Sequence, residues 1–473
     1  MEWKAAIFVA SNNLASVFNS RRANSVEQAR VDERPSGPVD TSCLGYEQST
    51  LFDEMEHTGR SMFVTGRAGT GKSYLLNFFV RNSSKNVVVV APTGVAAINV
   101  GGQTVHSFFR IPSETPIPKN DLIPTPSRRE LYQCIDSIVI DEVSMVRADV
   151  MDAIDFVLRA ANDTDVPFGG KQMLLFGDLY QLPPVAQPQV RRYLDDTFGG
   201  AFFFNALGVR ASGLAIRELT HIFRQKDPAF IEVLNQVREG RVSMEALSLL
   251  NQRADIPMPT DDDEGGGTAI IIAPTKDAVE KTNEAMLEGI DEPLFTYEAE
   301  IEGDFRQTEF PTQRVLKLKV GARVMMLDND LGTESDRPQE GRRWANGTIG
   351  QVSRLSSDSV WVMVNGVSHQ IRRRTWMKRQ YSYDANSKKL ENRKTATFMQ
   401  FPLTLAWAIT IHKAQGATYQ SVGIDMGNGM FAEGQTYVAL SRCVDMNRLY
   451  LSRPIEPRDI LTSNEVRQFM EGC

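Results

Sequence analysis

The stretch Gly66-Arg67-Ala68-Gly69-Thr70-Gly71-Lys72-Ser73 decides the fold of this chain, because it satisfies the pattern G-x-x-x-x-G-K-[ST] at every fixed position. Residues 61–65 before it, with Met62, Phe63 and Val64 at their centre, predict a short buried strand, and residues 74–80 after it have the apolar density of a buried helix. Glycines in such a loop permit positive φ angles, so successive backbone N–H groups can surround phosphate oxygens at the helix N-terminus. The sequence therefore predicts an α/β fold whose first loop binds a nucleoside triphosphate.

Side chains in and near this loop predict ATP and Mg²⁺ as the cofactors. We expect Lys72 to reach the β- and γ-phosphates and the hydroxyl of Ser73 to bind Mg²⁺. Gln48 lies on a helix expected to begin near residue 44, where its amide could read the N6 and N7 edge of adenine or simply face solvent. The other positions expected to hold the nucleotide are Gly66, Ala68, Gly69, Thr70 and Gly71.

The composition narrows the class of protein. A length of 473 residues predicts about three domains or subdomains, and no apolar run is long enough to predict a transmembrane helix, so no membrane partner is expected. The net charge of −7 argues against a protein that coats nucleic acid with its whole surface, so any such binding must be local. The four cysteines include no C-x-x-C pair, which argues against a zinc site and favours a reducing compartment. Residues 1–43 are expected to form a disordered arm.

Polar residues follow a second apolar strand, 86–90, at the position where open parallel sheets bind ligands. Pro92, Thr93 and Gly94 come directly after this strand, and they could hold a nucleic-acid phosphate or merely begin a helix. His106 and Phe109 lie further on, where they could contact bases or pack in the interior. These five positions are the first candidates for a nucleic-acid interface.

Two later strands end in groups suited to hydrolysis. Residues 137–140 lead into Asp141, which can hold the water shell of Mg²⁺, and Glu142, which can orient or deprotonate the attacking water. Residues 172–176 lead toward Gln181, whose amide can sense the γ-phosphate. Carboxylates after a strand that follows a phosphate loop predict hydrolysis of the nucleotide rather than its storage.

Together these stretches resemble the Q-motif and motifs I, Ia, II and III of superfamily 1 helicases. The segment from Met145 through residues 167–170 to Gly177-Asp178 is similar to the signature of PIF-type (petite integration frequency) DNA helicases of superfamily 1B, and the likeness extends from about residue 44 to the end. The resemblance implies that Arg224 and Arg442 are arginine fingers and that Gly416 approaches the nucleotide. It also implies that single-stranded DNA is held by Thr410, His412, Lys413 and Gln415.

The resemblance implies two RecA-like P-loop domains. The first is expected over residues 44–210, with a short inserted wedge loop near 111–130, and the second over 211–302 and 399–473. A β-rich, SH3-like barrel is expected as an insertion over 303–398. Within it, the basic run 372–379 with its aromatic Trp376 suits phosphates and a stacked base, or is a solvated strand end. The acidic run 261–267 is expected to be an exposed linker.

The resemblance further implies an ATP-dependent helicase that moves 5′ to 3′ on single-stranded DNA and unwinds forked or tailed duplexes as a monomer. G-quadruplexes and RNA–DNA hybrids are further candidate substrates, and replication, repair, recombination and telomere maintenance are candidate processes. Such a protein is expected in the cytoplasm (nucleoid) of a prokaryote, or in the nucleus or mitochondrion of a eukaryote. The alternatives are a RecD-like helicase subunit, a nucleotide-gated DNA-binding ATPase that does not translocate, and a P-loop kinase.

Overall fold

The computed structural model describes residues 39–112, 115–258, 269–328, 343–344, 347–384 and 389–472. Most of the expected N-terminal arm and the whole acidic run 261–267 lie outside the described residues. Within the described part of the chain, no helix is both long and apolar enough to cross a bilayer.

The first domain is built on a sheet of six parallel strands in the order β3-β2-β4-β5-β1-β6. Its strands are β1 (Met62–Gly66), β2 (Val87–Ala91), β3 (Gln103–Thr104), β4 (Ser137–Ile140), β5 (Gln172–Phe176) and β6 (Ala215–Leu219). Its helices are α2 (Tyr46–His57), α3 (Lys72–Asn82), α4 (Gly94–Asn99), α5 (Val105–Phe109), α6 (Pro126–Gln133), α7 (Ala148–Asn162), α8 (Pro188–Phe198) and α9 (Leu207–Ala211).

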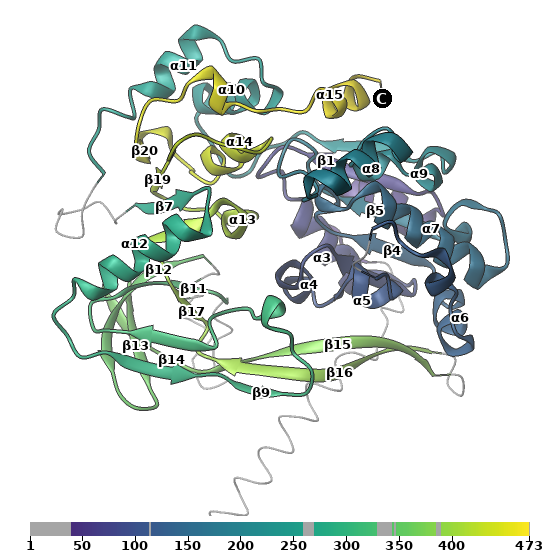
Figure 1. Ribbon diagram of the computed structural model, residues 1–473, viewed down its shortest axis with the longest axis horizontal. Coiled ribbons are helices and arrows are strands. Elements are labelled where there is room, and N and C mark those ends of the chain that lie inside the picture. Colours follow the sequence, from purple (N-terminus) through teal and green to yellow (C-terminus); the bar gives the residue numbers. More distant parts are fainter. Residues whose placement is uncertain are drawn as a thin grey trace, which may run out of the picture.

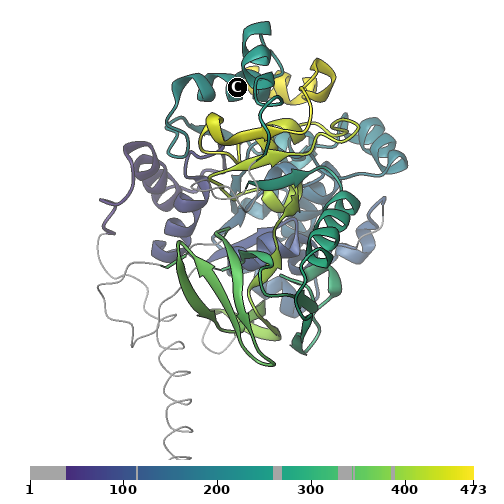
Figure 2. The same ribbon diagram turned by 90° about the vertical axis from the view of Figure 1, so that its left-hand side faces the viewer.

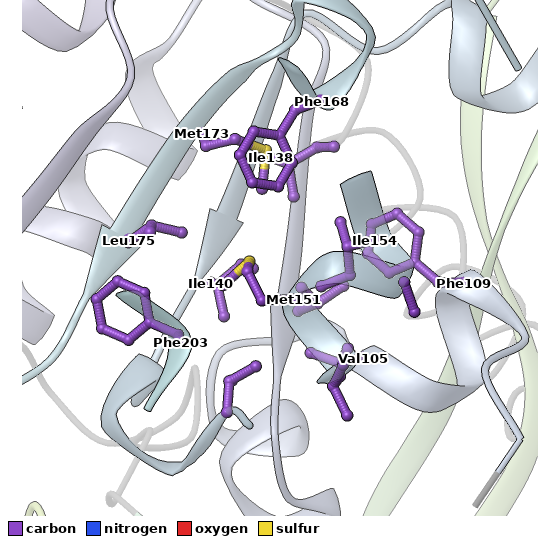
Figure 3. Packing of buried hydrophobic residues seen from close by; sticks show 14 of the residues in the cluster. Val105, Phe109, Ile138, Ile140, Met151, Ile154, Phe168, Met173, Leu175 and Phe203 are labelled. Carbon is purple, nitrogen blue, oxygen red and sulfur yellow. The ribbon is translucent and has the colours of Figure 1, made fainter. Parts of the chain in front are cut away.

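Helices cover both faces of this sheet, which explains why its strands are apolar runs rather than alternating patterns. Side chains of successive residues point to opposite faces, so Met62 packs with α2 and α3 while Phe63 packs with the other core. Figure 3 shows that second core, where Ile138 and Ile140 of β4 face Met151 and Ile154 of α7.

Two expectations about the first domain are wrong in detail. Strand β6 pairs in parallel with β1 over its whole length, so the first domain continues to Leu219 at least, beyond the expected boundary at 210. The insertion near 111–130 is helical in part, because it contains a 3-10 turn over Lys119–Leu122 and helix α6. Leu122, together with Leu131 and Tyr132 at the end of α6, is buried in the core that Figure 3 shows, so the insertion packs against the domain.

The second domain has four parallel strands in the order β18-β7-β19-β20. They are β7 (Ile270–Ala273), β18 (Ala408–Thr410), β19 (Val422–Ile424) and β20 (Leu449–Leu451). Its helices are α10 (Pro228–Glu239), α11 (Met244–Asn251), α12 (Lys276–Glu288), α13 (Ile411–Ala414) and α14 (Gln435–Leu440). The last helix, α15 (Asn464–Glu471), crosses back to the first domain, where Val466 is buried in the core and Phe469 stacks on Phe204 at 4.1 Å.

A β-rich region separates the two parts of the second domain in sequence. Five antiparallel strands lie in the order β14-β13-β12-β11-β17, and a long hairpin pairs with β9. The strands are β8 (Phe295–Glu298), β9 (Glu300–Glu302), β10 (Val315–Leu318), β11 (Arg323–Met326), β12 (Ile349–Leu355), β13 (Val360–Val364), β14 (Val367–Ile371), β15 (Arg374–Asp384), β16 (Lys389–Gln400) and β17 (Leu403–Leu405). This region is wider than the expected 303–398, and its closure into an SH3-like barrel stays a prediction.

The β-rich region lies at the end of the molecule opposite α11 (Figures 1 and 2). The β15–β16 hairpin runs from this region beneath α4 and α5 and reaches α6 of the first domain (Figure 1). The hairpin therefore lies beside helix α4 of the first domain.

Candidate nucleotide site and nucleic-acid interface

The expected catalytic groups meet at one edge of the first sheet. Strand β5 lies between β4 and β1, and all three are parallel, so their carboxyl ends share one edge. The loop 66–73 follows β1, Asp141 and Glu142 follow β4, and Asp178 lies just beyond β5. This is the edge at which open α/β sheets bind their ligands.

The glycines of the loop are required by its backbone and by its neighbours. Gly69 and Gly71 have φ angles of +88° and +81°, in the left-handed region that side chains disfavour. A Cβ at Gly69 would lie 2.6 Å from the Cβ of Arg224, and one at Gly71 would lie 2.4 Å from Nε2 of Gln48. The loop is therefore a tight backbone cradle that both residues approach closely.

Two phosphate-binding groups of this loop already have partners. The Nζ of Lys72 donates to the carbonyl oxygens of Gly66 at 2.6 Å and Arg67 at 3.1 Å. The backbone N–H of Ala68 donates to the hydroxyl of Tyr437, on helix α14 of the second domain, at 2.9 Å. Burial lowers the pKa of Lys72, and the negative charges of Asp178 and Glu142 partly oppose this shift. A bound triphosphate would replace both sets of bonds.

The side chain of Gln48 is hydrogen-bonded to the phosphate-binding loop in this structure. Its Oε1 accepts from the N–H of Gly45 at 3.1 Å, and its Nε2 donates to the carbonyl of Gly71 at 3.3 Å. The side chain is buried, so it does not simply face solvent. Its predicted contact with adenine stays a prediction, as does the Mg²⁺ contact of Ser73, whose side chain is exposed at the start of α3.

The two carboxylates after β4 sit in a strained and desolvated position. Glu142 has a φ angle of +50°, which is uncommon for a residue with a side chain and is frequent at functional sites. Its N–H donates to Oδ1 of Asp141 at 3.0 Å. Burial raises the pKa of both carboxyls, and the charge of Asp141 raises that of Glu142 further. A carboxylate with a raised pKa is a better proton acceptor near neutral pH.

Gln415 lies in the nucleotide cleft in this structure, and its predicted contact with DNA stays a prediction. Its Nε2 donates to Oε2 of Glu142 at 2.9 Å and to Oε1 of Gln181 at 3.3 Å. The Nε2 of Gln181 in turn donates to Asp178 at 3.3 Å. Gln415 directly follows the short helix α13 of the second domain, and its side chain reaches Glu142 of the first domain.

Both predicted arginine fingers lie at the boundary between the two domains. Nη1 of Arg224 donates to the carbonyl of Ser441 at 3.1 Å. Arg442 is almost completely buried, and its guanidinium donates to the carbonyls of Val438 at 2.9 Å and Ala417 at 3.1 Å. Burial lowers the pKa of each arginine. Their role on a γ-phosphate stays a prediction, as does the approach of Gly416 to the nucleotide.

The predicted nucleic-acid residues fall into two groups. Thr93 and Thr410 each cap a helix, because their hydroxyls accept from Ala96 and Lys413 N–H groups at 3.2 Å. The side chains of His412 and Lys413 are exposed on α13, and Thr93 is exposed before α4, beside the partly buried Pro92 and Gly94. The exposed members of this set are available to a strand, and their role on DNA stays a prediction.

Phe109 is in the hydrophobic core, so its predicted contact with bases is wrong for this structure. Its ring stacks on Tyr132 with 5.8 Å between centroids, and Figure 3 shows it beside Ile154. Helix α5 has only five residues, and Val105, Phe108 and Phe109 all face the interior. His106, on the same helix, is partly buried, and burial together with Arg147 lowers its pKa.

Comparison with known proteins identifies the family. A family model for PIF1-like helicases matches residues 43–247. The ATP-dependent DNA helicase Pif1 of Bdellovibrio bacteriovorus is 32% identical over 91% of this chain and 92% of its own length. This chain belongs to the PIF1-like helicase family. The ATP-dependent DNA helicase PIF1 of Mus musculus is 35% identical over 86% of this chain, which spans only 59% of the mouse protein.

A Pif1 from Bacteroides sp shares the fold. Its unliganded structure is 39% identical and has a TM-score of 0.80, covering 91% of this chain and 96% of that one. Bacteroides Pif1 bound to single-stranded DNA is 38% identical, covers 92% and 97%, and has a TM-score of 0.64. These matches confirm the predicted α/β fold with RecA-like domains, and they confirm the predicted PIF-type family.

The prediction that a base stacks on Trp376 is wrong for this structure, because the side chain is buried. Trp376 is buried and packs against Phe398 with 6.0 Å between ring centroids. Arg373 donates to the carbonyl of Glu298 at 2.9 Å, and Lys378 pairs with Glu309 at 2.9 Å. The cause is that β15 pairs with β16, which turns the tryptophan toward the interior of the hairpin sheet.

Two residues of this PIF1-like site have no counterpart in the sequence predictions. Tyr437 binds the loop N–H of Ala68, and Arg238 of α10 pairs with Asp178 at 3.1 Å while lying 4.2 Å from the ring centroid of Tyr180. Arg238 could have been noticed in the sequence, because it is a cation next to the apolar positions of the amphipathic helix α10. A charge that is buried there requires a partner of opposite charge. For Tyr437 the sequence offered no such signal.

Proposed function

We propose that this chain is an ATP-dependent DNA helicase that moves 5′ to 3′ on single-stranded DNA. The observation that carries the proposal is the bond between Glu142 of the first domain and Gln415 of the second, because the group expected to activate water touches the domain that must move. A second contact between the domains supports it, because the hydroxyl of Tyr437 in the second domain accepts a hydrogen bond from the loop N–H of Ala68. The family relatives are named ATP-dependent DNA helicases, in agreement with this proposal.

The residues of the cleft fit ATP and Mg²⁺. The glycine cradle and Lys72 suit the phosphates, and Ser73 and Asp141 would supply oxygen ligands to the metal. Among the described residues no cluster of three or more His, Cys, Asp or Glu side chains could hold a metal by itself. Mg²⁺ usually takes one or two protein ligands and completes its shell with water and phosphate, so Ser73 and Asp141 would be sufficient protein ligands. The bound metal would neutralise charge on the β- and γ-phosphates.

The protein groups have separate roles in the proposed hydrolysis. Lys72 orients the triphosphate, and Glu142 accepts a proton from the attacking water. Arg224 and Arg442 stabilise charge on the γ-phosphoryl group when the domains close, which contributes roughly 10³-fold or more in comparable enzymes. Gln181 would contact the γ-phosphate, and its bond to Gln415 connects it to the second domain.

The proposed partner is single-stranded DNA at a fork or a duplex tail. A Bacteroides Pif1 has been solved with single-stranded DNA. In this chain, the exposed His412 and Lys413 lie at the carboxyl end of a parallel strand, where open α/β sheets bind ligands. We propose action as a monomer, an SH3-like barrel within the β-rich region, and a location in the nucleoid of a prokaryote or in the nucleus or mitochondrion of a eukaryote.

Strand displacement tests this function. We expect unwinding of a duplex with a 5′ tail and none of a duplex with a 3′ tail, and equal use of both tails would refute the polarity. Lys72→Ala should abolish ATP hydrolysis and unwinding while DNA binding remains, because the role proposed for Lys72 is on the phosphates and not on DNA. DNA-stimulated hydrolysis without displacement would instead favour an ATPase that does not translocate.

A further inference from the structure

The catalytic carboxylate of Glu142 is occupied by a donor from the other domain. Nε2 of Gln415 lies 2.9 Å from Oε2 of Glu142, and Oε1 of Gln181 shares the same amide group at 3.3 Å. An amide N–H that donates to a carboxylate oxygen blocks that oxygen from accepting a hydrogen bond from water in the same direction. An amide also cannot take up a proton, so Gln415 cannot replace Glu142 as a base.

Gln415 follows a short helix that carries two exposed basic side chains. Helix α13 is capped by Thr410, and its Ile411 and Ala414 are buried, whereas His412 and Lys413 are exposed. These exposed residues lie three and two positions before Gln415, so a phosphate that binds them would contact the segment that positions the amide.

The backbone after Gln415 has room to turn. Gly416 has a φ angle of +78°, and no atom lies within 4 Å of the position that a Cβ would take there. Arg442 contacts the same segment through the carbonyl of Ala417 at 3.1 Å. This side of the segment is therefore open, which leaves space for Gln415 to move away from Glu142.

We propose that Gln415 is a positioning residue that keeps Glu142 from activating water until single-stranded DNA binds α13. The inference rests on the proposed helicase function and adds the regulation of its site: DNA contact moves Gln415, frees the carboxylate oxygen, and so makes hydrolysis depend on DNA. The bond occurs in a structure whose TM-score is higher to unliganded Bacteroides Pif1 than to its complex with single-stranded DNA.

The test compares full-length Gln415→Met with the wild type, with and without saturating oligo-dT. Methionine has a similar length and cannot donate, so we expect the DNA-free kcat to rise about tenfold, as the loss of a bond to a charged group predicts. The kcat at saturating DNA should stay within about twofold, so the ratio of stimulated to basal rates falls. Gln420→Met is the matched control, because Gln420 is an exposed glutamine of the same domain, and it should leave both rates unchanged.

Two results would overturn the proposal. A DNA-free kcat that stays unchanged means that the bond does not restrain Glu142, and a parallel fall of both rates means that Gln415 assists the reaction itself. Gln415→Ala, with its unfolding temperature measured, keeps the test valid if the methionine variant folds poorly. Failure of the proposed function is distinguishable, because it appears in the wild type as an absence of strand displacement whatever the DNA-free rate of the variant.

Discussion

Arg238 and Asp178 form a buried ion pair, with 3.1 Å between Nη2 and Oδ1, that joins helix α10 to the loop after strand β5. The exposed fractions of the two side chains are 5% and 0%. Burial opposes the ionisation of Asp178, but the charges of Arg238 and Lys72 hold its pKa below the usual value. Each partner therefore keeps its charge in the interior because the other is present.

Removal of Arg238 should destabilise the protein strongly. Arg238→Met leaves the charge of Asp178 buried without its partner, and we expect the free energy of unfolding to fall by about 3–5 kcal/mol. Urea denaturation measures the change. The control is Arg241→Met, because the pair of Arg241 with Glu471 is exposed and should contribute less than about 1 kcal/mol. Similar losses in the two variants would show that burial of the pair has no special effect.

The hydroxyl of Tyr437 should compete with ATP for the loop. It accepts a hydrogen bond from the N–H of Ala68, and loop N–H groups of this kind hold the phosphates of a nucleotide. Tyr437→Phe therefore leaves this N–H without its partner in the free protein. We expect the Kd for ATP to fall by about 2–10-fold, which corresponds to one hydrogen bond. Isothermal titration measures it, with Tyr450→Phe as the control. A higher Kd in Tyr437→Phe would mean that the hydroxyl contributes to nucleotide binding instead.

The first domain could be predicted closely because its motifs are local. Strand β5 has the predicted bounds 172–176, and the strand before the loop differs from prediction by one residue, since buried apolar runs next to glycine loops specify both. The helix in the expected loop insertion was missed, although Pro126 at its first position is a known start signal.

The contacts between domains could not be predicted in the same way. Gln415, Tyr437 and Arg238 acquire their partners only when the second domain is placed against the first, and no period of apolar residues encodes that placement. Phe109 and Trp376 were misjudged for a related reason. Each lies beside polar or basic residues in sequence, and only tertiary packing determines which face of a short helix or hairpin points inward.

The buried position of Phe109 predicts a loss of stability rather than of DNA affinity. Phe109→Ala leaves a cavity beside Tyr132 and Ile154, which typically lowers the free energy of unfolding by about 3–5 kcal/mol. Under conditions in which the variant remains folded, its Kd for single-stranded DNA should match that of the wild type. Phe431→Ala, at an exposed phenylalanine, should change stability by less than about 0.5 kcal/mol. Weaker DNA binding by folded Phe109→Ala would support a direct contact.

The pair of Arg453 with Asp459 predicts a dependence of stability on pH. Arg453 donates two hydrogen bonds of 2.8 Å to Asp459, and these bonds, against burial, hold the pKa of Asp459 below its usual value of 3.8. A lowered folded pKa stabilises the protein above the unfolded pKa, and the contribution is lost as the pH falls through the folded value. Arg453→Met should therefore lower the urea midpoint at pH 7 but match the wild type at an acid pH below the folded pKa of Asp459, where the carboxyl is protonated in both states. Arg458→Met, in an exposed pair with Glu456, should change little at either pH. An equal deficit of Arg453→Met at both pH values would mean that Arg453 acts through packing instead of charge.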